Sequence, residues 1–243
     1  LQNLDDAPAR VPAFCLDAHE VTLAQYRAFA TRQGVEVPRE VRWRGVTPSD
    51  HAADLHCTGG HDATREREPF NCIDWSAARA YCRAAGADLP AEAQWELALR
   101  GEDNAPYPWG RRAPATGDLN ACGRECVALL RTLEGDPELN PLFDAADSFV
   151  ATAPVGSFEA DRNPHGVTDL AGNVREWLLD GFGSTPSESA TRDPESHDYH
   201  VVRGGSWKSA LPTGLDLAHR GRVRADVRDV DIGFRCASPV RTQ

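Results

Sequence analysis

Residues 166–177 constrain the fold of this chain more than any other stretch. They read Gly-Val-Thr-Asp-Leu-Ala-Gly-Asn-Val-Arg-Glu-Trp, and the carboxylates of Asp169 and Glu176 stand on either side of a turn that contains Gly172 and Asn173. Gly and Asn tolerate positive φ, so this turn can direct carbonyl and side-chain oxygens towards one point. Calcium binds several oxygens from a compact loop, so the stretch predicts a calcium loop. The alternative is an ordinary Asx turn followed by a helical turn, with Glu176 exposed.

Composition limits the classes of partner. The 243 residues can bury a sizeable core in one or two domains. Lys and Arg number 26 against 37 Asp and Glu, giving a formal net charge of −11. This charge argues against a nucleic-acid partner or an anionic membrane, since both are bound through basic patches. No apolar run approaches the roughly 18 residues of a transmembrane helix, so membrane insertion is not expected.

Cysteine usage indicates the compartment. Seven cysteines in a chain of this size favour an oxidising, extracytoplasmic location: periplasmic, secreted or cell-surface. Their odd number leaves at least one thiol without a partner in the same chain. The chain begins at Leu1 and contains no Met, so we expect a processed form or a piece of a larger protein.

Hydrophobic spacing predicts few regular elements. A strand is expected within residues 11–21, and Thr22 is the expected N-cap of a helix that ends at Gly34. Further helices are expected at residues 76–85 and 91–100. These short elements leave much of the chain for loops.

The loops are long and need anchors. Residues 35–71 are polar and aperiodic, which predicts a surface excursion tied down by cysteines, and loop chemistry also prevails from residue 110 to 158. Residues 183–198 are predicted to be exposed. A buried strand is expected at residues 201–207, where it runs into a glycine turn, and a last core strand at 232–236. We therefore predict one α+β domain with ordered loops held by disulfides and metal ions.

Several motifs occur in a fixed order along the chain. They are Cys-Ile-Asp-Trp at 72–75, Ala-Tyr-Cys at 80–82, Leu-Pro-Ala-Glu-Ala-Gln-Trp-Glu at 89–96, Tyr-Pro-Trp-Gly at 107–110, Thr-Ala-Pro-Val-Gly-Ser-Phe at 152–158, Arg-Gly-Gly-Ser-Trp at 203–207 and Gly-Phe-Arg-Cys at 233–236. Together they resemble the formylglycine-generating enzyme, or sulfatase-modifying factor, family from about Phe14 to Cys236. The resemblance implies a single irregular, loop-rich α+β domain over residues 1–243, with a core at about 14–237 and a fold distantly related to C-type lectins.

The resemblance also implies two calcium sites built from oxygen ligands. The first would use the side chains of Asp169 and Glu176 and the carbonyls of Gly172 and Val174. The second would use Asn120, the Ala121 carbonyl, Asp147 and the Phe149 carbonyl. Asp169 stands where the family often has Asn, and its extra charge should favour a cation.

The chain departs from the family after residue 207. Family members that oxidise a sulfatase cysteine carry two copper-binding cysteines there, at the positions of Ser209 and Gly214. A hydroxyl and a hydrogen do not replace two thiolates, which suit copper(I). We therefore expect no copper and no formylglycine generation by this chemistry.

Disulfides follow from the same resemblance. It pairs Cys82 with Cys236, and we further expect Cys122 with Cys126 and Cys57 with Cys72, leaving Cys15 free.

The family's substrate cleft is expected to persist with altered polarity. Arg175 replaces a Trp and Asp231 replaces an Asn, whereas Ser206 and Arg222 match the family. The expected cleft residues are Arg175, Ser206, Trp207, Ser209, Arg222 and Asp231. The ligand could be a protein, a peptide or a small molecule.

Two histidine groups offer weaker metal signals. His51, His56, Cys57 and His61 could hold zinc or copper, but their spacing fits no standard finger, so we interpret them as exposed histidines and a disulfide cysteine. His197 and His200 could face the cleft as a pair, although the family shows no such ligands there.

Three functions are compatible with these features. The first is a catalytically degenerate, calcium-stabilised binding or structural module. The second is an oxidoreductase of the same family that uses another metal or cofactor and a non-sulfatase substrate. The third is a regulatory or sensor module of a larger protein, for instance one attached to a kinase. A metal analysis would separate them, because calcium alone favours a module and stoichiometric copper or iron favours an enzyme.

Overall fold

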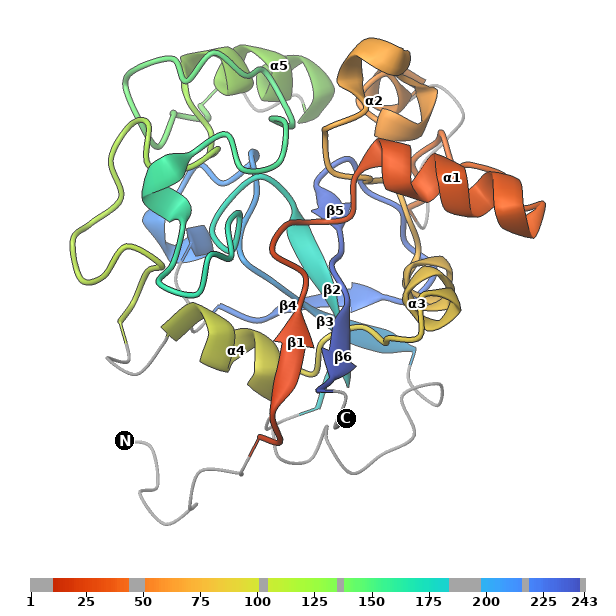
Figure 1. The fold of residues 1–243 in the computed structure, drawn as a ribbon. Coiled ribbons are helices and arrows are strands. Elements are labelled where there is room, and N and C mark those ends of the chain that lie inside the picture. The colour runs from red at the N-terminus through yellow and green to blue at the C-terminus, as the bar shows by residue number, and fades with distance from the viewer. Residues whose placement is uncertain are drawn as a thin grey trace.

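Two small sheets form the centre of the protein. The computed structural model describes residues 11–43, 51–100, 105–134, 138–183, 198–215 and 219–240. One sheet has the order β4-β3-β2-β5 and the other pairs β1 with β6 (Figure 1). The strands are β1 Phe14–Leu16, β2 Arg175–Gly181, β3 Tyr199–Arg203, β4 Gly221–Arg224, β5 Ile232–Gly233 and β6 Ala237–Pro239. Neighbouring strands are antiparallel except β2 and β5, which are parallel.

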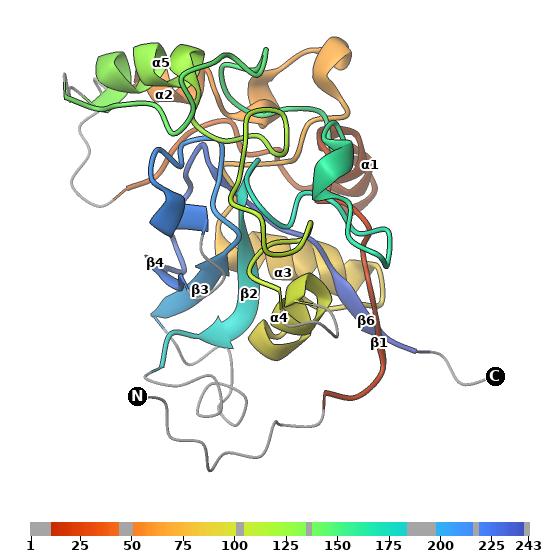
Figure 2. The same cartoon turned by 90° about the vertical axis from the view of Figure 1, so that its left-hand side faces the viewer.

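Short helices and long loops surround the sheets. The α-helices are α1 Leu23–Gln33, α2 His51–Asp54, α3 Trp75–Ala84, α4 Glu92–Arg100 and α5 Arg124–Glu134. Single 3₁₀ turns occupy Thr58–Gly60, Ala63–Arg65, Glu159–Asp161 and Pro212–Leu215. In both views α2 and α5 lie at one end of the molecule, away from α3 and α4 (Figures 1 and 2). The result is the irregular α+β fold that was predicted.

Local capping explains where the predicted helices begin and end. Thr22 caps α1 through a capping box with Gln25, and Gly34 ends the helix with φ 67°. The Asp74 side chain accepts a hydrogen bond from Ala77 N at the start of α3. The predicted helix over residues 91–100 is α4, which buries Trp95 and Leu99.

The structure corrects the expected loop between residues 110 and 158. Helix α5 lies within it and buries Cys126, Val127 and Leu130. The signal was present as an apolar i, i+3, i+4 spacing at Cys126, Leu129 and Leu130. Glycines and prolines on both sides of the segment obscured it.

The strand assignments also need correction. The predicted strand at residues 232–236 is only two residues long, because the chain leaves β5 after Gly233 and pairs again as β6. Strand β4 was not predicted, and the 172–173 turn leads into β2 rather than into a helical turn. Of the segment predicted to be exposed at 183–198, residues 184–197 lie outside the described part.

All three expected disulfides are present. They join Cys57 to Cys72, Cys82 to Cys236 and Cys122 to Cys126, and Cys15 is free and exposed. The excursion after α1 is thus tied down at Cys57 and Cys72, and Cys82–Cys236 joins α3 to the residue before β6. In the described part of the chain, no helix is long and apolar enough to cross a membrane.

Candidate functional site

The loop before β2 adopts the positive-φ conformations predicted for Gly172 and Asn173, whose φ values are 87° and 55°. Asp169 also has a positive φ, 58°, which was not predicted. A Cβ on Gly172 would lie 2.3 Å from the carbonyl oxygen of Asn120, so only glycine fits there. This contact brings together the segments of the two predicted calcium sites.

Asn173 ties the loop to four other parts of the chain. Its Nδ2 donates to Glu20 Oε2 at 2.6 Å, and its Oδ1 accepts from Asn120 Nδ2 and from Ala153 N, each at 3.0 Å. Its carbonyl accepts from Trp207 N at 2.9 Å. The buried side-chain amide of Asn173 therefore fixes the loop relative to the segments that contain Glu20, Asn120 and Ala153.

Glu176 is fully buried, so the interpretation that left it exposed is wrong. Arg235 Nη2 donates to Glu176 Oε1 at 2.7 Å, Arg235 Nε donates to Oε2 at 2.9 Å, and Trp95 Nε1 donates to Oε2 at 3.0 Å. Both carboxylate oxygens are thus occupied by protein donors. The first predicted calcium site therefore has one of its two carboxylates already paired with a guanidinium.

Asp169 and Glu176 belong to a larger group of buried acids. Burial raises the pKa of Glu20 and that of Asp161 well above their usual values, and the charges of Asp169 and Glu176 raise both further. Arg235 lowers both pKa values but does not offset burial. Glu20 and Asp161 were not recognised in the sequence. Nothing local marks Glu20, which is 153 positions from Asn173, as a neighbour of the loop, and the nearby Asp161 has no spacing that would predict its burial against Asp169.

The second predicted calcium site contains buried oxygens without a hydrogen-bond partner. Asn120 is 2% exposed, and among the described residues its Oδ1 has no donor. Asp147 Oδ1 accepts from Phe149 N at 2.8 Å, in the turn that presents the Phe149 carbonyl. Glu125, which the sequence analysis missed, accepts from Asp147 N at 2.8 Å and leaves its buried Oε2 without a donor. Vacant oxygen acceptors fit a hard cation such as calcium.

Ser209 and Gly214 lie side by side. A Cβ built on Gly214 would be 3.4 Å from Ser209 Oγ and 3.6 Å from Ser209 Cβ, which is ordinary van der Waals contact. Ser209 Oγ accepts from Ser206 N at 3.0 Å. Two longer side chains at positions 209 and 214 would therefore touch each other. In this chain Ser209 contributes a hydroxyl and Gly214 only a hydrogen.

The predicted cleft residues are joined by a polar cluster. Arg175 Nη2 and Nε donate to Asp231 Oδ1 and Oδ2 at 2.7 and 3.0 Å, and Ser206 Oγ donates to Asp231 Oδ2 at 2.8 Å. Burial would raise the pKa of Asp231, but the charges of Arg175 and Lys208 and these hydrogen bonds lower it to about 2. Burial and the charge of Asp231 raise the pKa of Asp229 to about 6.

Two expected cleft residues lie outside this cluster of contacts. Trp207 is buried and donates from Nε1 to Val230 O at 3.2 Å. Arg222 is on β4, with its guanidinium carbon 3.7 Å from the centroid of the Tyr199 ring. The structure thus joins Arg175, Ser206, Ser209 and Asp231 by direct contacts and places Arg222 two strands away from Arg175.

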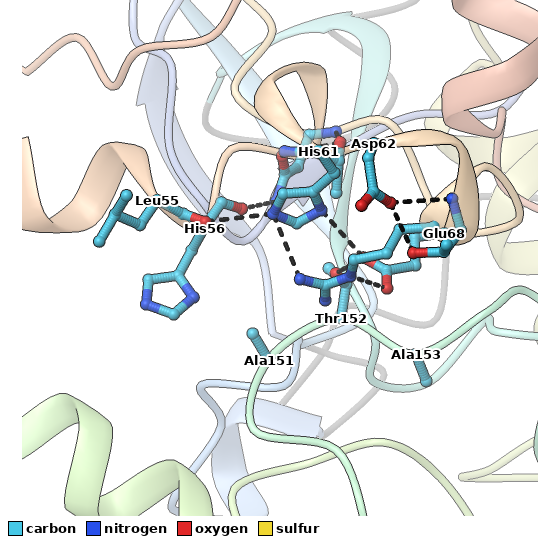
Figure 3. A network of polar contacts seen from close by, with 12 residues as sticks. Leu55, His56, His61, Asp62, Glu68, Ala151, Thr152 and Ala153 are labelled. Atoms are coloured by element: carbon cyan, nitrogen blue, oxygen red, sulfur yellow. Dashed lines mark hydrogen bonds and ion pairs between the residues drawn. The ribbon is translucent and has the colours of Figure 1, made fainter.

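The histidine group at residues 51–61 does not form a metal site among the described residues. Cys57 is in a disulfide, as expected. His61 is not exposed as expected: its side chain is 10% exposed, with Nδ1 3.5 Å from Glu68 Oε2 and Nε2 3.1 Å from Leu55 O (Figure 3). Thr152 Oγ1 also donates to Glu68 Oε2, at 2.8 Å, so Glu68 holds the excursion against the 151–153 segment.

The remaining histidine predictions are tested only in part. The side chain of His51 and the whole of His197 lie outside the described residues. His200 is fully buried and stacks on Trp75 with 3.8 Å between the ring centroids.

Comparison with known proteins gives relatives of several kinds. The chain is 30% identical over 240 residues to the serine/threonine-protein kinase pkn1 of Chlamydia caviae, covering 94% of this chain and 33% of the kinase. It is 32% identical to the formylglycine-generating enzyme of Mycobacterium tuberculosis, covering 95% and 89%. It is 32% identical to the inactive C-alpha-formylglycine-generating enzyme 2 of Mus musculus, covering 70% and 49%. The chain thus spans about a third of the kinase and about half of the mouse protein.

A solved structure shares the fold. PvdO from Pseudomonas aeruginosa superposes with a TM-score of 0.67 at 22% identity, over 93% of this chain and 80% of PvdO. Residues 4–240 match the family described as the sulfatase-modifying factor enzyme 1-like domain. With this match across almost its full length, the chain belongs to the FGE-sulfatase family.

Proposed function

We propose that this protein is a calcium-stabilised binding or structural module of the FGE-sulfatase family that does not catalyse copper-dependent formylglycine formation. The observation that carries the proposal is the contact between Ser209 and Gly214, whose side-chain positions are 3.4–3.6 Å apart. The resemblance to the family implies two copper-binding thiolates at these positions in members that oxidise a sulfatase cysteine. Here the fold keeps the two positions together, but neither residue offers a soft ligand.

The neighbouring polar cluster supports a change of function rather than simple loss of two ligands. The Arg175–Asp231 pair and the Ser206 hydroxyl form a connected set of hydrogen bonds beside Ser209. The resemblance implies an aromatic ring and an amide at the positions of Arg175 and Asp231, so the charged pair would offer a ligand different partners. Ser206 and Asp231 are buried, and Arg175 is the more exposed residue of the pair, at 26%. A protein, peptide or small molecule that suits these charges would bind there.

Calcium is proposed at both predicted sites, with unequal support. The second site has vacant oxygens on Asn120 and Glu125, and its residues fit the ion. At the first site Arg235 already occupies Glu176, so Asp169 and the carbonyls of Gly172 and Val174 would carry more of the binding. In either site a bound ion would stabilise loops that have little regular structure of their own.

Relatives and disulfides support the remaining parts of the proposal. One relative is named an inactive enzyme. Another is a kinase, and the region that is similar to this chain makes up 33% of the kinase. Both are compatible with a module that binds rather than reacts. Three disulfides support an extracytoplasmic location, where such bonds persist.

Metal analysis and an activity assay test the proposal together. Protein purified without added metal should contain calcium and no stoichiometric copper or iron. With copper(I), oxygen and a sulfatase-type cysteine peptide, it should form no aldehyde above a no-enzyme control, with the M. tuberculosis relative as positive control. Copper-dependent aldehyde formation by the unmodified chain would overturn the proposal. Stoichiometric iron or copper would instead favour an oxidoreductase that uses another metal or substrate.

A further inference from the structure

Glu125 contacts the Asp147 turn of the second proposed calcium site. It is in the first turn of α5, three residues after Cys122 and one before Cys126, at the end of the molecule shown uppermost in Figure 2. Its Oε1 accepts hydrogen bonds from Asp147 N at 2.8 Å and from Ser148 N at 3.0 Å. The carboxylate is therefore held against the turn that carries Asp147 and the Phe149 carbonyl.

The second oxygen of Glu125 is in an unusual position. Glu125 Oε2 is buried and has no donor among the described residues. It lies 3.1 Å from the place of a Cβ on Gly123, and that Cβ would also be 2.7 Å from Ala145 O. A Cβ at position 123 would collide with Ala145 O, so the position requires glycine. Ala145 O accepts a hydrogen bond from Arg124 N, whereas a buried Glu125 Oε2 without a donor would be stabilised by a cation.

A second oxygen of the proposed site also lacks a donor among the described residues. Asn120 is 2% exposed and its Oδ1 has no donor among the described residues, although its Nδ2 makes two hydrogen bonds. The chain segments are joined directly, since Leu142 N donates to Cys122 O at 2.8 Å and Arg124 N donates to Ala145 O at 3.2 Å. Residues 120–125 and 142–149 thus form one small unit, with oxygens from both segments.

We propose that Glu125 is an additional calcium ligand of the second site and that the Cys122–Cys126 disulfide holds it in position. The disulfide closes a loop with a sequence separation of 4, which fixes the first turn of α5 relative to Asn120 and Ala121. Without this link, Glu125 would be positioned only by its hydrogen bonds from Asp147 N and Ser148 N and by the packing of α5. The inference rests on the proposed binding of calcium at this site, and it adds a further ligand together with a covalent support for it.

Calcium titration of the full chain tests the ligand. Glu125→Gln keeps an oxygen that can accept from Asp147 N and Ser148 N but removes the charge, so the fold is preserved. We expect wild type to bind two ions and Glu125→Gln to bind one of them at least tenfold more weakly, as Asp147→Asn should. The matched control is Asp144→Asn, which removes an equal charge three residues from Asp147. The Asp144 side chain is 86% exposed and is paired with Arg124.

The outcomes separate the two proposals. If Glu125→Gln binds both ions with wild-type affinity, Glu125 is not a ligand, while calcium binding stands. If Asp144→Asn weakens binding as much as Glu125→Gln, the effect is one of general charge, and the inference fails. If wild type binds no calcium at all, the calcium part of the proposed function fails and the inference fails with it.

A double-mutant cycle tests the role of the disulfide. Replacing Cys122 and Cys126 by serine should weaken the second ion at least several-fold in the wild-type background. The same replacement should have little effect in the Glu125→Gln background, because the ligand that the disulfide positions is already lost. Equal losses in both backgrounds would show general loosening of the fold and would overturn the positioning role.

Discussion

Glu176 and Arg235 form an ion pair that is completely enclosed by protein. The Nη2–Oε1 distance is 2.7 Å and both side chains are 0% exposed. Arg235 also donates from Nη1 to Asp17 O at 3.0 Å and from Nη2 to Thr168 O at 2.8 Å. One guanidinium near the C-terminal end therefore joins β1, the loop before β2 and β2 itself.

Removing Arg235 should strongly destabilise the protein. Arg235→Met leaves Glu176 buried and unpaired near Glu20 and Asp169, which typically costs about 3–5 kcal/mol. Urea denaturation in the presence of a chelator measures the loss. Arg224→Met is the control: it breaks the more exposed Arg224–Asp226 pair, 2.9 Å long, and should cost far less, because solvent screens an exposed pair. Similar losses for the two variants would contradict the importance of the buried pair.

The three disulfides should differ in their contributions. A disulfide stabilises the folded protein by lowering the entropy of the unfolded chain, and this effect grows with the length of the closed loop. Cys82–Cys236, with a separation of 154, should stabilise the protein by about 5 kcal/mol, and Cys122–Cys126, with a separation of 4, by about 2 kcal/mol. Paired Cys→Ala variants compared by thermal unfolding should follow this order. The prediction fails if the short loop proves to be the more stabilising of the two.

The Asp229–Asp231 pair should make stability depend on pH. Asp229 has a pKa raised from 3.8 to about 6, so its stabilising contribution is complete below about pH 4 and is lost as the pH rises through 6. Asp231, with a pKa lowered to about 2, contributes above 3.8 and loses this contribution only as the pH falls through 2. Between pH 5 and pH 7.5, Asp229→Asn should therefore gain about 1.4 kcal/mol in stability relative to wild type, because wild type loses that much of the contribution over this interval.

Denaturation curves at the two pH values check this prediction. Asp226→Asn is the control, since the Asp226 side chain is 52% exposed and its removal should have no comparable pH dependence. A constant difference between Asp229→Asn and wild type at both pH values would rule out a shared proton in the pair.

Restoring the two cysteines should create a copper(I) site. The Cβ positions of residues 209 and 214 are 3.6 Å apart, close enough for two thiolates to bind one ion. Ser209→Cys with Gly214→Cys should take up one copper(I) per chain in competition with a chromophoric chelator, whereas wild type and each single variant should not. We expect no peptide oxidation even then, because Arg175 and Asp231 remain in the cleft. Failure of the reduced double variant to bind copper would show that the two positions do not meet in solution.

Calcium should raise the thermal midpoint. A ligand at 100 times its Kd stabilises by about 2.7 kcal/mol, or roughly 5–10 °C for a domain of this size. Asp169→Asn should reduce this response without backbone strain, because Asn tolerates the φ of 58° at that position. A melting curve that a chelator leaves unchanged would remove the main consequence of the calcium proposal.

The sequence alone determined the features that depend on local chemistry or on ordered motifs. The ends of α1 follow from the Thr22–Gln25 capping box and from Gly34. The positive φ values of Gly172 and Asn173 follow from the residue types. The family followed from motifs spread over the whole chain, and the three disulfides were paired correctly from that resemblance together with cysteine spacing. Helix α5 could have been recognised from its apolar spacing, but its surroundings suggested a loop.

Only the tertiary structure decided which polar groups meet. Glu20 reaches Asn173 across 153 positions, and Arg235 reaches Glu176 across 59. No local sequence pattern predicts these contacts, because a buried polar or charged group is paired by whichever segment the fold brings next to it. The same holds for Glu125, which in the sequence is an ordinary helix residue and in the structure supports the turn of Asp147. The contact of Ser209 with Gly214 is likewise a property of the fold, whereas the absence of thiols there is a property of the sequence.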